Sequence, residues 1–349
     1  MIYYLSDNLI KRFIKWGRDH FTMRVTIKDI AAAARVSPAV VSAVLNRNKS
    51  IRCSEEKRQL ILELVRNMGY RPNRAAQVLG KRKSRQIGVL SYSPSDPSVA
   101  RIIGELERQI SERGYSAVFG FWSDYASIET AFDSVLAHPL DGLISMHNGL
   151  IDAVPEGLPT VYYGDVPGKC CVKLDYRQYF EQVLTLLAGL GHKTIGFVCW
   201  HHENLYELFC SVCAEKGLQT SPFWSPEGSG FYENALETAL ELLRSEERPD
   251  ALICRNDVVA FAVINAAKQC GLRVPEDISV VGFDDIAPAS YFIPPLTTCG
   301  APAEKIASTL LEILFTGAEP GMTLIDMDLI IRGTCSQKNK LQSTIFRKE

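Results

Sequence analysis

The chain has 349 residues, of which 46% are hydrophobic and 22% are charged, and its formal net charge is −2. These values are typical of a globular protein and exclude a disordered or collagen-like chain, and the length allows two or three domains. No apolar run approaches the length of a membrane span, which argues against a membrane protein. The ten cysteines are scattered, and we interpret them as reduced structural thiols of a cytoplasmic protein.

Residues 1–22 mix apolar and basic side chains and do not fit the fold that follows them. They lack the uninterrupted apolar core and the small-residue cleavage site of a signal peptide. Met23 stands directly before the first clear helix signal. We expect translation to start at Met23, so that residues 1–22 are an extension that is not native. The alternative is a poorly ordered arm.

The next segment predicts three short helices. Thr26, followed three residues later by an aspartate, is a capping-box pattern that starts the first helix. Ser37 is a good N-cap and Pro38 suits the first helical position, where its missing N–H costs nothing, so together they start the second helix. Ser54 caps the third helix, which Gly69 ends. The predicted helices cover about 27–34, 38–46 and 54–69.

Apolar residues at helical spacing give these helices a common core. The inward side chains are predicted to be Ile27, Ile30, Ala31, Ala34, Val41, Val44, Leu45, Ile61, Leu64, Val65 and Met68. The second helix then keeps an exposed face made of Ala39, Ser42, Ala43, Asn46 and Arg47. Two helices around a short turn, with one face left exposed, are typical of a helix-turn-helix DNA reader.

Charge separates this segment from the rest of the chain. Residues 24–85 hold 15 Lys or Arg and 4 Asp or Glu, whereas residues 86–349 hold 19 basic and 34 acidic side chains. The nearly neutral net charge therefore combines a basic N-terminal segment, the basic head, with an acidic remainder of the chain. A basic module of this size is typical of a protein that binds nucleic-acid phosphates, and it argues against a three-helix bundle without a partner.

After a basic linker at 81–85, short apolar strands alternate with helices. The first series predicts strands over about 87–90, 117–121, 142–145 and 160–163, with helices over 99–113, 128–137 and 179–190. The second series predicts strands over about 195–199, 251–254 and 278–283, with helices over 204–216, 232–243 and 258–270, and a further helix over 306–315. Such alternation predicts an α/β fold with two lobes. Each lobe is a doubly wound parallel sheet, and a cleft lies at the carboxyl ends of the strands.

Several motifs in both parts of the chain form a recognisable set. They are Thr26-Ile27-Lys28-Asp29-Ile30-Ala31, Val41-Ser42, Val44-Leu45-Asn46, Gly69-Tyr70-Arg71-Pro72-Asn73, Arg255-Asn256-Asp257, residues 274–285, and Pro294-Pro295-Leu296-Thr297-Thr298. In these motifs the chain resembles the lactose-repressor family of bacterial transcriptional regulators, as far as about residue 334. The resemblance implies an all-α helix-turn-helix domain followed by a two-lobe fold like that of periplasmic binding proteins. It also implies a homodimer on a nearly palindromic double-stranded DNA operator.

The domains are expected to follow the family's plan. The helix-turn-helix domain covers 23–71, the hinge helix and linker 72–85, the two-lobe domain 86–335 and a loose tail 336–349. Within the two-lobe domain, the first lobe is expected over about 86–190 and 301–325, and the second over about 191–298 and 326–335.

By this resemblance, the second helix enters the major groove and the hinge reaches the minor groove. The expected DNA contacts are Thr26, Ser37, Pro38, Ala39, Ser42, Ala43, Asn46, Arg47, Asn73, Arg74, Ala76 and Leu79. We expect Ser37, Asn46 and Arg47 to hold phosphates more than bases. Leu79 is expected to be the apolar wedge in the minor groove, as opposed to an ordinary linker leucine, and Ala76 to pack in the hinge pair.

The reading helix departs from the family pattern at two positions. Many family members have Arg where this chain has Ala43, and Thr where it has Val40. An arginine can bind guanine through two hydrogen bonds, whereas alanine offers only a methyl group. We therefore expect an unusual operator.

The resemblance also implies a small-molecule effector, a sugar or related metabolite, in the cleft between the lobes. The expected effector-binding residues are Tyr92, Asp96, Ile102, Asp165, Trp200, Asn256, Asp257 and Asp284. A structural role is the alternative: Asp257 could cap the helix after it, and Asp284 could fix a turn. The arginine and glutamine that the family uses for its effector fall at Leu205 and Ala301. We therefore expect a cleft less polar than a sugar site.

These features favour a sequence-specific DNA-binding regulator, in particular a repressor, which is cytoplasmic and associates with the nucleoid when bound to its operator. The alternative is a solute-binding module of the same fold without DNA regulation, which the basic head disfavours. The chain shows no catalytic or metal-binding constellation, so we expect neither an enzyme nor a cofactor, metal or membrane partner. No heptad repeat follows residue 334, which favours a dimer over a tetramer.

Overall fold

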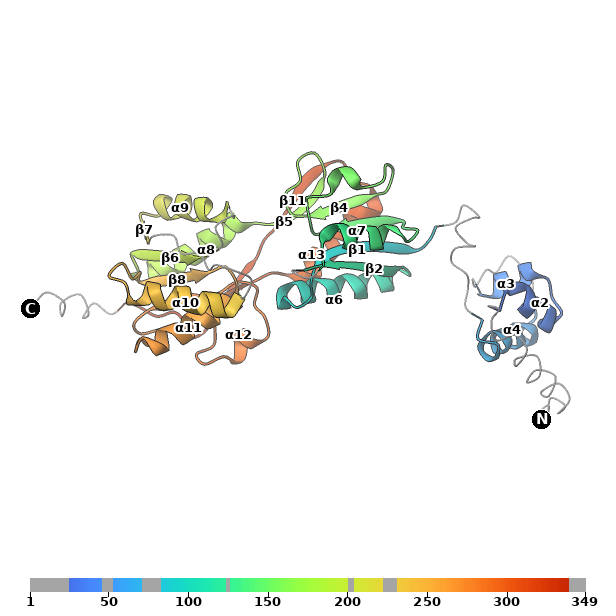
Figure 1. The fold of residues 1–349 in the computed structure, drawn as a ribbon, viewed down its shortest axis with the longest axis horizontal. Helices are drawn as coiled ribbons and strands as arrows, with labels where there is room; N and C mark the ends of the chain where they lie inside the picture. Colours follow the sequence, from blue (N-terminus) through green and yellow to red (C-terminus); the bar gives the residue numbers. More distant parts are fainter. Residues whose placement is uncertain are drawn as a thin grey trace, which may run out of the picture. The chain divides into compact units, whose positions relative to one another are not determined.

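The computed structural model describes residues 25–45, 53–70, 83–123, 126–199, 204–221 and 231–338. The chain divides into two compact units, Met1–Lys83 and Ser84–Glu349, and each is described by itself. Three helices make up the described part of the first unit, and two parallel sheets with their covering helices make up the second (Figure 1).

The first unit contains the helices α2 (Ile27–Ala34), α3 (Pro38–Leu45) and α4 (Glu55–Asn67). The N–H of Thr26 donates to Oδ2 of Asp29 over 2.8 Å, and together they form the predicted capping box. Arg35 ends α2 in the left-handed region at φ 51°, which turns the chain towards α3. The predicted helix bounds are thus confirmed wherever the structure describes them.

A small apolar core joins these three helices. Ile30 from α2, Val41 from α3 and Ile61 from α4 are fully buried in one cluster, and the other predicted inward residues pack against them. Because each helix has 13 residues or fewer, this shared burial, and not helix propensity, is what stabilises them.

The first lobe of the second unit is built on six parallel strands in the order β11-β5-β4-β3-β1-β2. Their bounds are β1 (Gln86–Tyr92), β2 (Ser116–Trp122), β3 (Gly142–Ser145), β4 (Thr160–Tyr163), β5 (Cys170–Leu174) and β11 (Gly321–Ile325). Three helices cover the sheet, namely α6 (Pro97–Glu112), α7 (Ile128–Leu136) and α13 (Ala303–Thr316), and a short 3-10 turn, η1 (Ile151–Ala153), follows β3.

Side chains alternate between the two faces of this sheet, as strand geometry requires. Ile87, Val89 and Ile144 face one core with α6 and α13. Leu90 and Leu143 face the other core with α7. Both faces are apolar, so the continuous hydrophobic runs seen in the sequence correspond to strands that are buried on both sides.

The second lobe is built on four parallel strands, β7 (Gln219–Thr220), β6 (Thr194–Val198), β8 (Ala251–Cys254) and β9 (Ser279–Val281), in that order. Its helices are α8 (Tyr176–Gly189), α9 (Leu205–Glu215), α10 (Phe231–Arg244), α11 (Asp257–Gln269) and α12 (Pro288–Tyr291). Helices α8 and α9 share one apolar core with this sheet, and α10 and α11 share the other.

Residues up to 190 were expected in the first lobe, and for α8 this expectation is wrong. Phe180 of α8 lies 5.4 Å, between ring centroids, from Phe197 of β6 and 5.7 Å from Phe209 of α9. The chain crosses to the second lobe directly after β5, because the large aromatic residues of α8 are buried there. The expected boundary is therefore about one helix too late.

Two further strands, β10 (Thr298–Gly300) and β12 (Asp328–Ile330), pair antiparallel where the chain passes between the lobes. The turn after β9 continues onto this pair, since Asp284 bridges Gly300. The two lobes therefore share a short hinge sheet.

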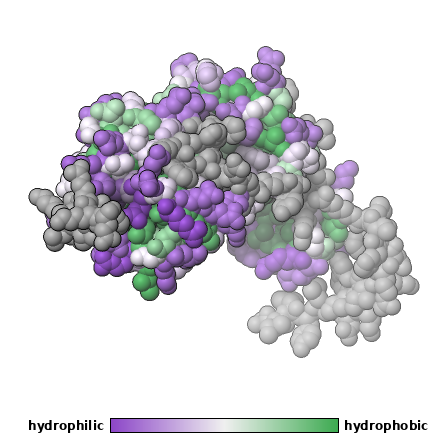
Figure 2. Space-filling view, turned by 60° about the vertical axis from the view of Figure 1, so that its left-hand side comes forward, coloured by the Kyte–Doolittle hydropathy of each residue, from purple (hydrophilic) through white to green (hydrophobic). Residues whose placement is uncertain are grey.

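No helix in the described ranges is long and apolar enough to cross a membrane. The face shown in Figure 2 is a patchwork in which green apolar residues form separate patches among purple polar ones. Among the described residues, the exposed large apolar side chains are Leu60, Tyr291, Ile293, Phe315, Met322, Leu324 and Ile331.

Candidate functional site

Helix α3 presents part of the face predicted to read DNA. Ser37, Pro38 and Ala39 are exposed, and Ser42 is half-buried. Thr26 is also exposed, and its hydroxyl donates to the Asp29 carboxylate over 2.6 Å. These residues stand at the start of α3 and of the helix before it, where a helix-turn-helix meets the DNA backbone.

Ala43 differs from the prediction. It was expected on the exposed face of the second helix, but only 6% of it is exposed. An alanine ends at Cβ, so its methyl group does not reach beyond the atoms that surround the helix. The expected exposure of Ala43 is therefore wrong, and its contact with DNA stays a prediction.

Some predicted site residues lie outside the described residues. They are Asn46, Arg47, Asn73, Arg74, Ala76, Leu79 and Trp200.

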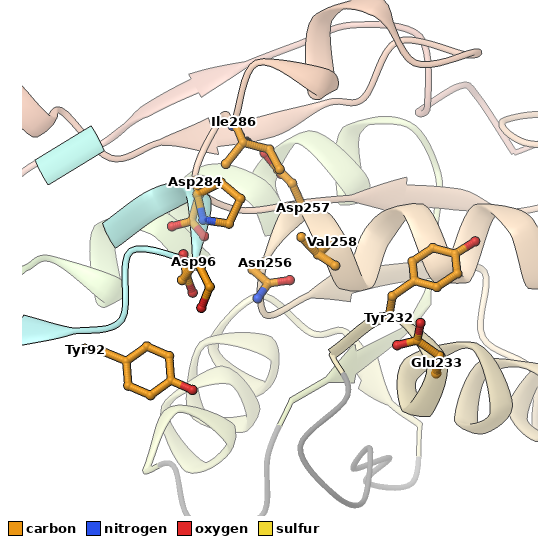
Figure 3. Close-up of a pocket in the computed structure, with 11 residues that line it drawn as sticks. Tyr92, Asp96, Tyr232, Glu233, Asn256, Asp257, Val258, Asp284 and Ile286 are labelled. Carbon is orange, nitrogen blue, oxygen red and sulfur yellow. Dashed lines mark hydrogen bonds between the residues drawn. The ribbon is translucent and has the colours of Figure 1, made fainter. Parts of the chain in front are cut away.

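A pocket of ≈ 380 Å³ lies at the carboxyl ends of the strands, between the two lobes (Figure 3). The first lobe contributes Tyr92, Ser95, Asp96 and Pro97, and the second contributes Tyr232, Glu233, Asn256, Asp257, Val258, Asp284 and Ile286. Figure 3 shows Asp96 and Asp284 together on one side, Tyr232 and Glu233 on the other, and Asn256 between them. Five of the eight predicted effector residues therefore meet in one cavity.

Asp96 and Asn256 each have a second, structural role. The Asp96 carboxylate caps α6 and accepts hydrogen bonds from the backbone N–H groups of Ser98, at 2.8 Å, and Val99, at 3.3 Å. Oδ1 of Asn256 caps α11 and accepts from the Val259 N–H over 2.9 Å. The cap of α11 is thus Asn256 and not Asp257, the residue that the structural alternative named. Both caps fix a polar side chain at the pocket wall.

Asp257 is fully buried and joins three segments of the chain. Its Oδ1 accepts from the Thr298 hydroxyl over 2.5 Å, and its Oδ2 accepts from the Ile286 N–H over 2.8 Å. Burial raises the pKa of this carboxyl from 3.8 to about 7, although its hydrogen bonds oppose the shift. Asp257 therefore ties the start of α11 to the loop after β9 and to β10.

Asp284 has the most unusual environment in the pocket. It is 9% exposed, and its backbone has a φ of 103°, a region that residues other than glycine seldom adopt. The guanidinium of Arg101, from α6 of the first lobe, donates to the carbonyl oxygen of Asp284 over 2.9 Å and to that of Asp285 over 2.7 Å. Burial raises the pKa of the Asp284 carboxyl well above its usual range, and the Arg255 guanidinium opposes this shift. The strained loop is thus held from across the cleft.

Two predicted effector residues lie elsewhere. Ile102 is buried in the core beneath α6. Asp165 is exposed and pairs with Lys173 over 3.0 Å. Neither residue lines the pocket described above, so their role in effector binding stays a prediction.

Sequence reasoning missed six pocket residues, namely Ser95, Pro97, Tyr232, Glu233, Val258 and Ile286. Ser95, Pro97 and Val258 are next to predicted site residues, so their place after the carboxyl end of a strand could have indicated them. Tyr232 and Glu233 begin α10, and no local signal indicates that this helix starts at the cleft.

The cleft was expected to be less polar than a sugar site, and the structure agrees with this only in part. Leu205 and Ala301 are apolar and packed in the core, as expected. The pocket is nevertheless acidic, because Asp96, Glu233, Asp257 and Asp284 all line it. Within the described residues, no group of three His, Cys, Asp or Glu side chains could hold a metal ion.

Comparisons with known proteins agree with this geometry. Residues 26–73 match the family described as bacterial regulatory proteins, lacI family, and residues 184–335 match a periplasmic binding protein-like domain. The chain is 30% identical over 304 residues to the HTH-type transcriptional repressor PurR of Photobacterium profundum, covering 83% of this chain and 90% of that protein. It is 29% identical over 305 residues to the PurR repressor of Pasteurella multocida, covering 83% of this chain and 91% of that protein.

Among solved structures, the lac repressor dimer bound to operator and the anti-inducer ONPF is similar, with a TM-score of 0.80 and 25% sequence identity. The match covers 90% of this chain and 100% of that one. A helix-turn-helix unit joined to this two-lobe fold defines a DNA-binding transcriptional regulator and not an enzyme. The chain belongs to the lacI family of bacterial regulatory proteins.

Proposed function

We propose that this regulator is a cytoplasmic repressor that binds a nearly palindromic operator as a homodimer. Its affinity is set by a small molecule in the pocket between the lobes. The observation that carries the proposal is that pocket, which residues from both lobes line at their strand ends. A ligand that contacts both lobes changes the free energy of their closure, and only such a difference between two states can alter operator binding.

The relatives support the direction of control. The PurR proteins are described as repressors, and the lac repressor structure holds operator and a small molecule together. For this chain we infer the same arrangement, with a helix-turn-helix domain over 23–71, a hinge and linker over 72–85 and a two-lobe domain over 86–335. The tail was expected to be loose from residue 336, and for residues 336–338 this is wrong, because Ser336 donates to Pro275 over 3.1 Å and the Lys338 N–H donates to Leu190 over 2.9 Å. The proposed organisation is completed by the extension over 1–22 and by a tail that starts after residue 338.

The dimer is proposed to use the first lobe. Strand β11 is an edge strand of its sheet, and Met322 and Leu324 expose apolar side chains from it. Phe315 of α13 is also exposed. An exposed apolar edge strand can pair with another chain and cause aggregation, and a dimer that covers it would prevent this.

The DNA contacts are proposed from position on the helix-turn-helix and hinge. Ser37, Pro38, Ala39 and Ser42 of the first unit face the groove or its phosphates, together with Thr26. By family resemblance, Asn46, Arg47, Asn73, Arg74 and Ala76 extend this surface, and Leu79 wedges into the minor groove.

The test is selection of bound sites from a random duplex pool with the full chain, at near-physiological salt. We expect enrichment of a near-palindrome with a flexible central step. Binding without enrichment that simply fades as salt rises would refute sequence-specific reading.

Two variants then separate the contacts. Leu79→Ala is expected to lower the affinity for the selected operator and to reduce the bending of the bound DNA, and to leave the fold intact. Arg47→Ala is expected to lower the affinity for all duplexes alike, and to reduce the dependence of that affinity on salt concentration by about one released ion. Equal operator affinity for Leu79→Ala and the parent would remove the wedge from the proposal.

A further inference from the structure

The pocket between the lobes has an uneven charge. Of its eleven described lining residues, four carry carboxyl groups and none is Lys, Arg or His. The carboxyl groups come from both lobes, since Asp96 follows β1 whereas Glu233, Asp257 and Asp284 belong to the second lobe. Figure 3 shows Asp96 and Asp284 on one side of the pocket and Glu233 on the opposite side.

Three of these acids are already accounted for. The Asp96 carboxylate caps α6, and that of Asp257 accepts hydrogen bonds from Thr298 and Ile286. Glu233 is exposed, so water can solvate it. These three groups therefore have partners or solvent without a ligand.

Asp284 is different, because its carboxyl group has no hydrogen-bond partner within the described part of the chain. It is nine-tenths buried and lines the cavity. Its backbone is held in place by Arg101, which binds its carbonyl oxygen and not its carboxylate. The Asp284 oxygens are not among the buried polar atoms that lack a partner in the described residues, so they open onto the cavity, where a ligand can reach them. A strained backbone such as that of Asp284, at φ 103°, is a feature of functional sites.

The chemistry that would satisfy this group is a charged donor. Arg255 is near enough to lower the pKa of Asp284, but its guanidinium lies over the rings of Tyr176 and Phe283, at 5.9 Å and 5.6 Å from their centroids. The pocket also holds two phenol rings, Tyr92 and Tyr232, and aromatic faces attract cations. An amine whose ammonium group meets Asp284 would therefore have aromatic rings elsewhere in the same cavity for the rest of its skeleton.

We propose that the small molecule recognised by this pocket carries a protonated primary amine, and that the Asp284 carboxylate is its counter-ion. The inference rests on the proposed effector pocket and names its ligand class. A cavity of ≈ 380 Å³ lies at the small end of ligand pockets, which suits an amine of about monosaccharide size. Asn256 lies between the two acidic sides, where its amide can orient the rest of the molecule.

The experiment compares amines with neutral partners of the same skeleton on the full chain. Calorimetric titrations use glucosamine against glucose, galactosamine against galactose, and putrescine against butane-1,4-diol. We expect at least one amine to bind about tenfold more tightly than its partner. Neutral compounds that bind as well as the amines, or a set in which no amine binds, would overturn the proposal.

The Asp284→Asn variant tests the counter-ion. Asparagine has the same size and tolerates positive φ, so the strained loop keeps its conformation. The amine that binds best is expected to lose about thirtyfold or more in affinity, because its charge is left without a partner in a buried site. Glu241→Gln, an exposed change on α10, removes the same charge outside the pocket and is expected to leave the affinity within about twofold. An unchanged amine preference in Asp284→Asn would reject Asp284 as the counter-ion.

Proton release provides a readout that needs no variant. Burial raises the pKa of the Asp284 carboxyl, and an ammonium group beside it favours its ionised form, so pairing with an amine drives the proton off this group. The ionisable and charged groups that act on it are Asp96, Arg101, Tyr163, Arg255, Asp257 and Cys299. Titrations in two buffers of different ionisation enthalpy should show a net proton released to the buffer with the amine and none with its neutral partner. Equal proton release by both would count against the proposal.

The operator selection keeps this inference separable from the proposed function. An enriched operator with no amine preference would refute only the ligand class. Amine binding without an enriched operator would refute only DNA reading.

Discussion

Asp257 makes the stability of this protein depend on pH in an unusual direction. Its carboxyl is fully buried, and desolvation raises its pKa from 3.8 to about 7. A raised pKa means that the folded state binds the proton more tightly than the unfolded state does. The stabilisation is therefore complete below about pH 4 and is lost as the pH rises through about 7.

The size of the effect follows from the shift. A shift of about three units corresponds to about 4 kcal/mol between the two protonation states, of which about 2 to 3 kcal/mol falls between about pH 5 and pH 8. The carboxyl group accepts two hydrogen bonds, from the Thr298 hydroxyl and the Ile286 N–H. A protonated Asp257 can keep both contacts, because the hydroxyl of Thr298 can turn from donor to acceptor.

The Asp257→Asn variant isolates this group. The amide cannot ionise, so the free energy of unfolding of the variant should not decline by about 2 to 3 kcal/mol between about pH 5 and pH 8. The variant also leaves one buried N–H unpaired, which lowers its stability by about 1 to 3 kcal/mol at every pH. Urea unfolding followed by far-ultraviolet circular dichroism at several pH values measures both proteins. Asp284 titrates in the same direction in each protein, and the Asp257 charge raises the pKa of Asp284, so the difference between the two curves reports Asp257 together with this coupling. Parallel curves for the variant and the parent would refute the reasoning.

Three further changes test the surrounding packing, and a fourth tests a helix cap. In Gly282→Ala, the new Cβ would lie 2.2 Å from Oδ1 of Asp257, so we expect a loss of about 1 to 3 kcal/mol or more by urea unfolding. Gly104→Ala in α6, which meets nothing within 4 Å, should instead gain about 1 kcal/mol, and a loss there would contradict the open space. Arg101→Met removes the hydrogen bonds to the loop after β9, so amide exchange in that loop should accelerate, and unchanged rates would show that the loop holds itself. Ser54→Ala should lower the free energy of unfolding of the helix-turn-helix unit by about 1 kcal/mol and Ser54→Gly by a few tenths, and equal losses would argue against capping.

Local signals in the sequence predicted the elements whose structure is decided locally. The capping box at Thr26 and the N-cap at Ser54 gave helix starts that the structure confirms. Continuous apolar runs gave the central strands of both sheets, and polar residues directly after those runs gave Asn256 and Asp284 of the pocket. Each of these signals lies within a few residues of the feature that it predicts.

The features that were missed depend on distant partners. Strand β5 includes Lys173, and it is a strand because it pairs with β11, about 150 residues later in the chain. The lobe to which α8 belongs is decided by where Phe180 is buried, and no pattern within the helix indicates which sheet that is. Tyr232 reaches the pocket for the same reason, because the start of α10 is placed there by packing on the second sheet.

The pocket and the hinge between the lobes meet in one loop, and this suggests how a ligand signal could travel. Asp284 lines the pocket, while its N–H donates to the Cys299 carbonyl of β10 over 2.8 Å. The next residue, Asp285, accepts from Arg332 over 2.7 Å, just beyond β12. Arg101 of the first lobe binds the carbonyl groups of both aspartates. A ligand that binds the Asp284 side chain therefore acts on the residue whose backbone already joins the lobes. If the ligand stabilises the closed lobes, closure must by linkage raise the affinity for the ligand by the same free energy.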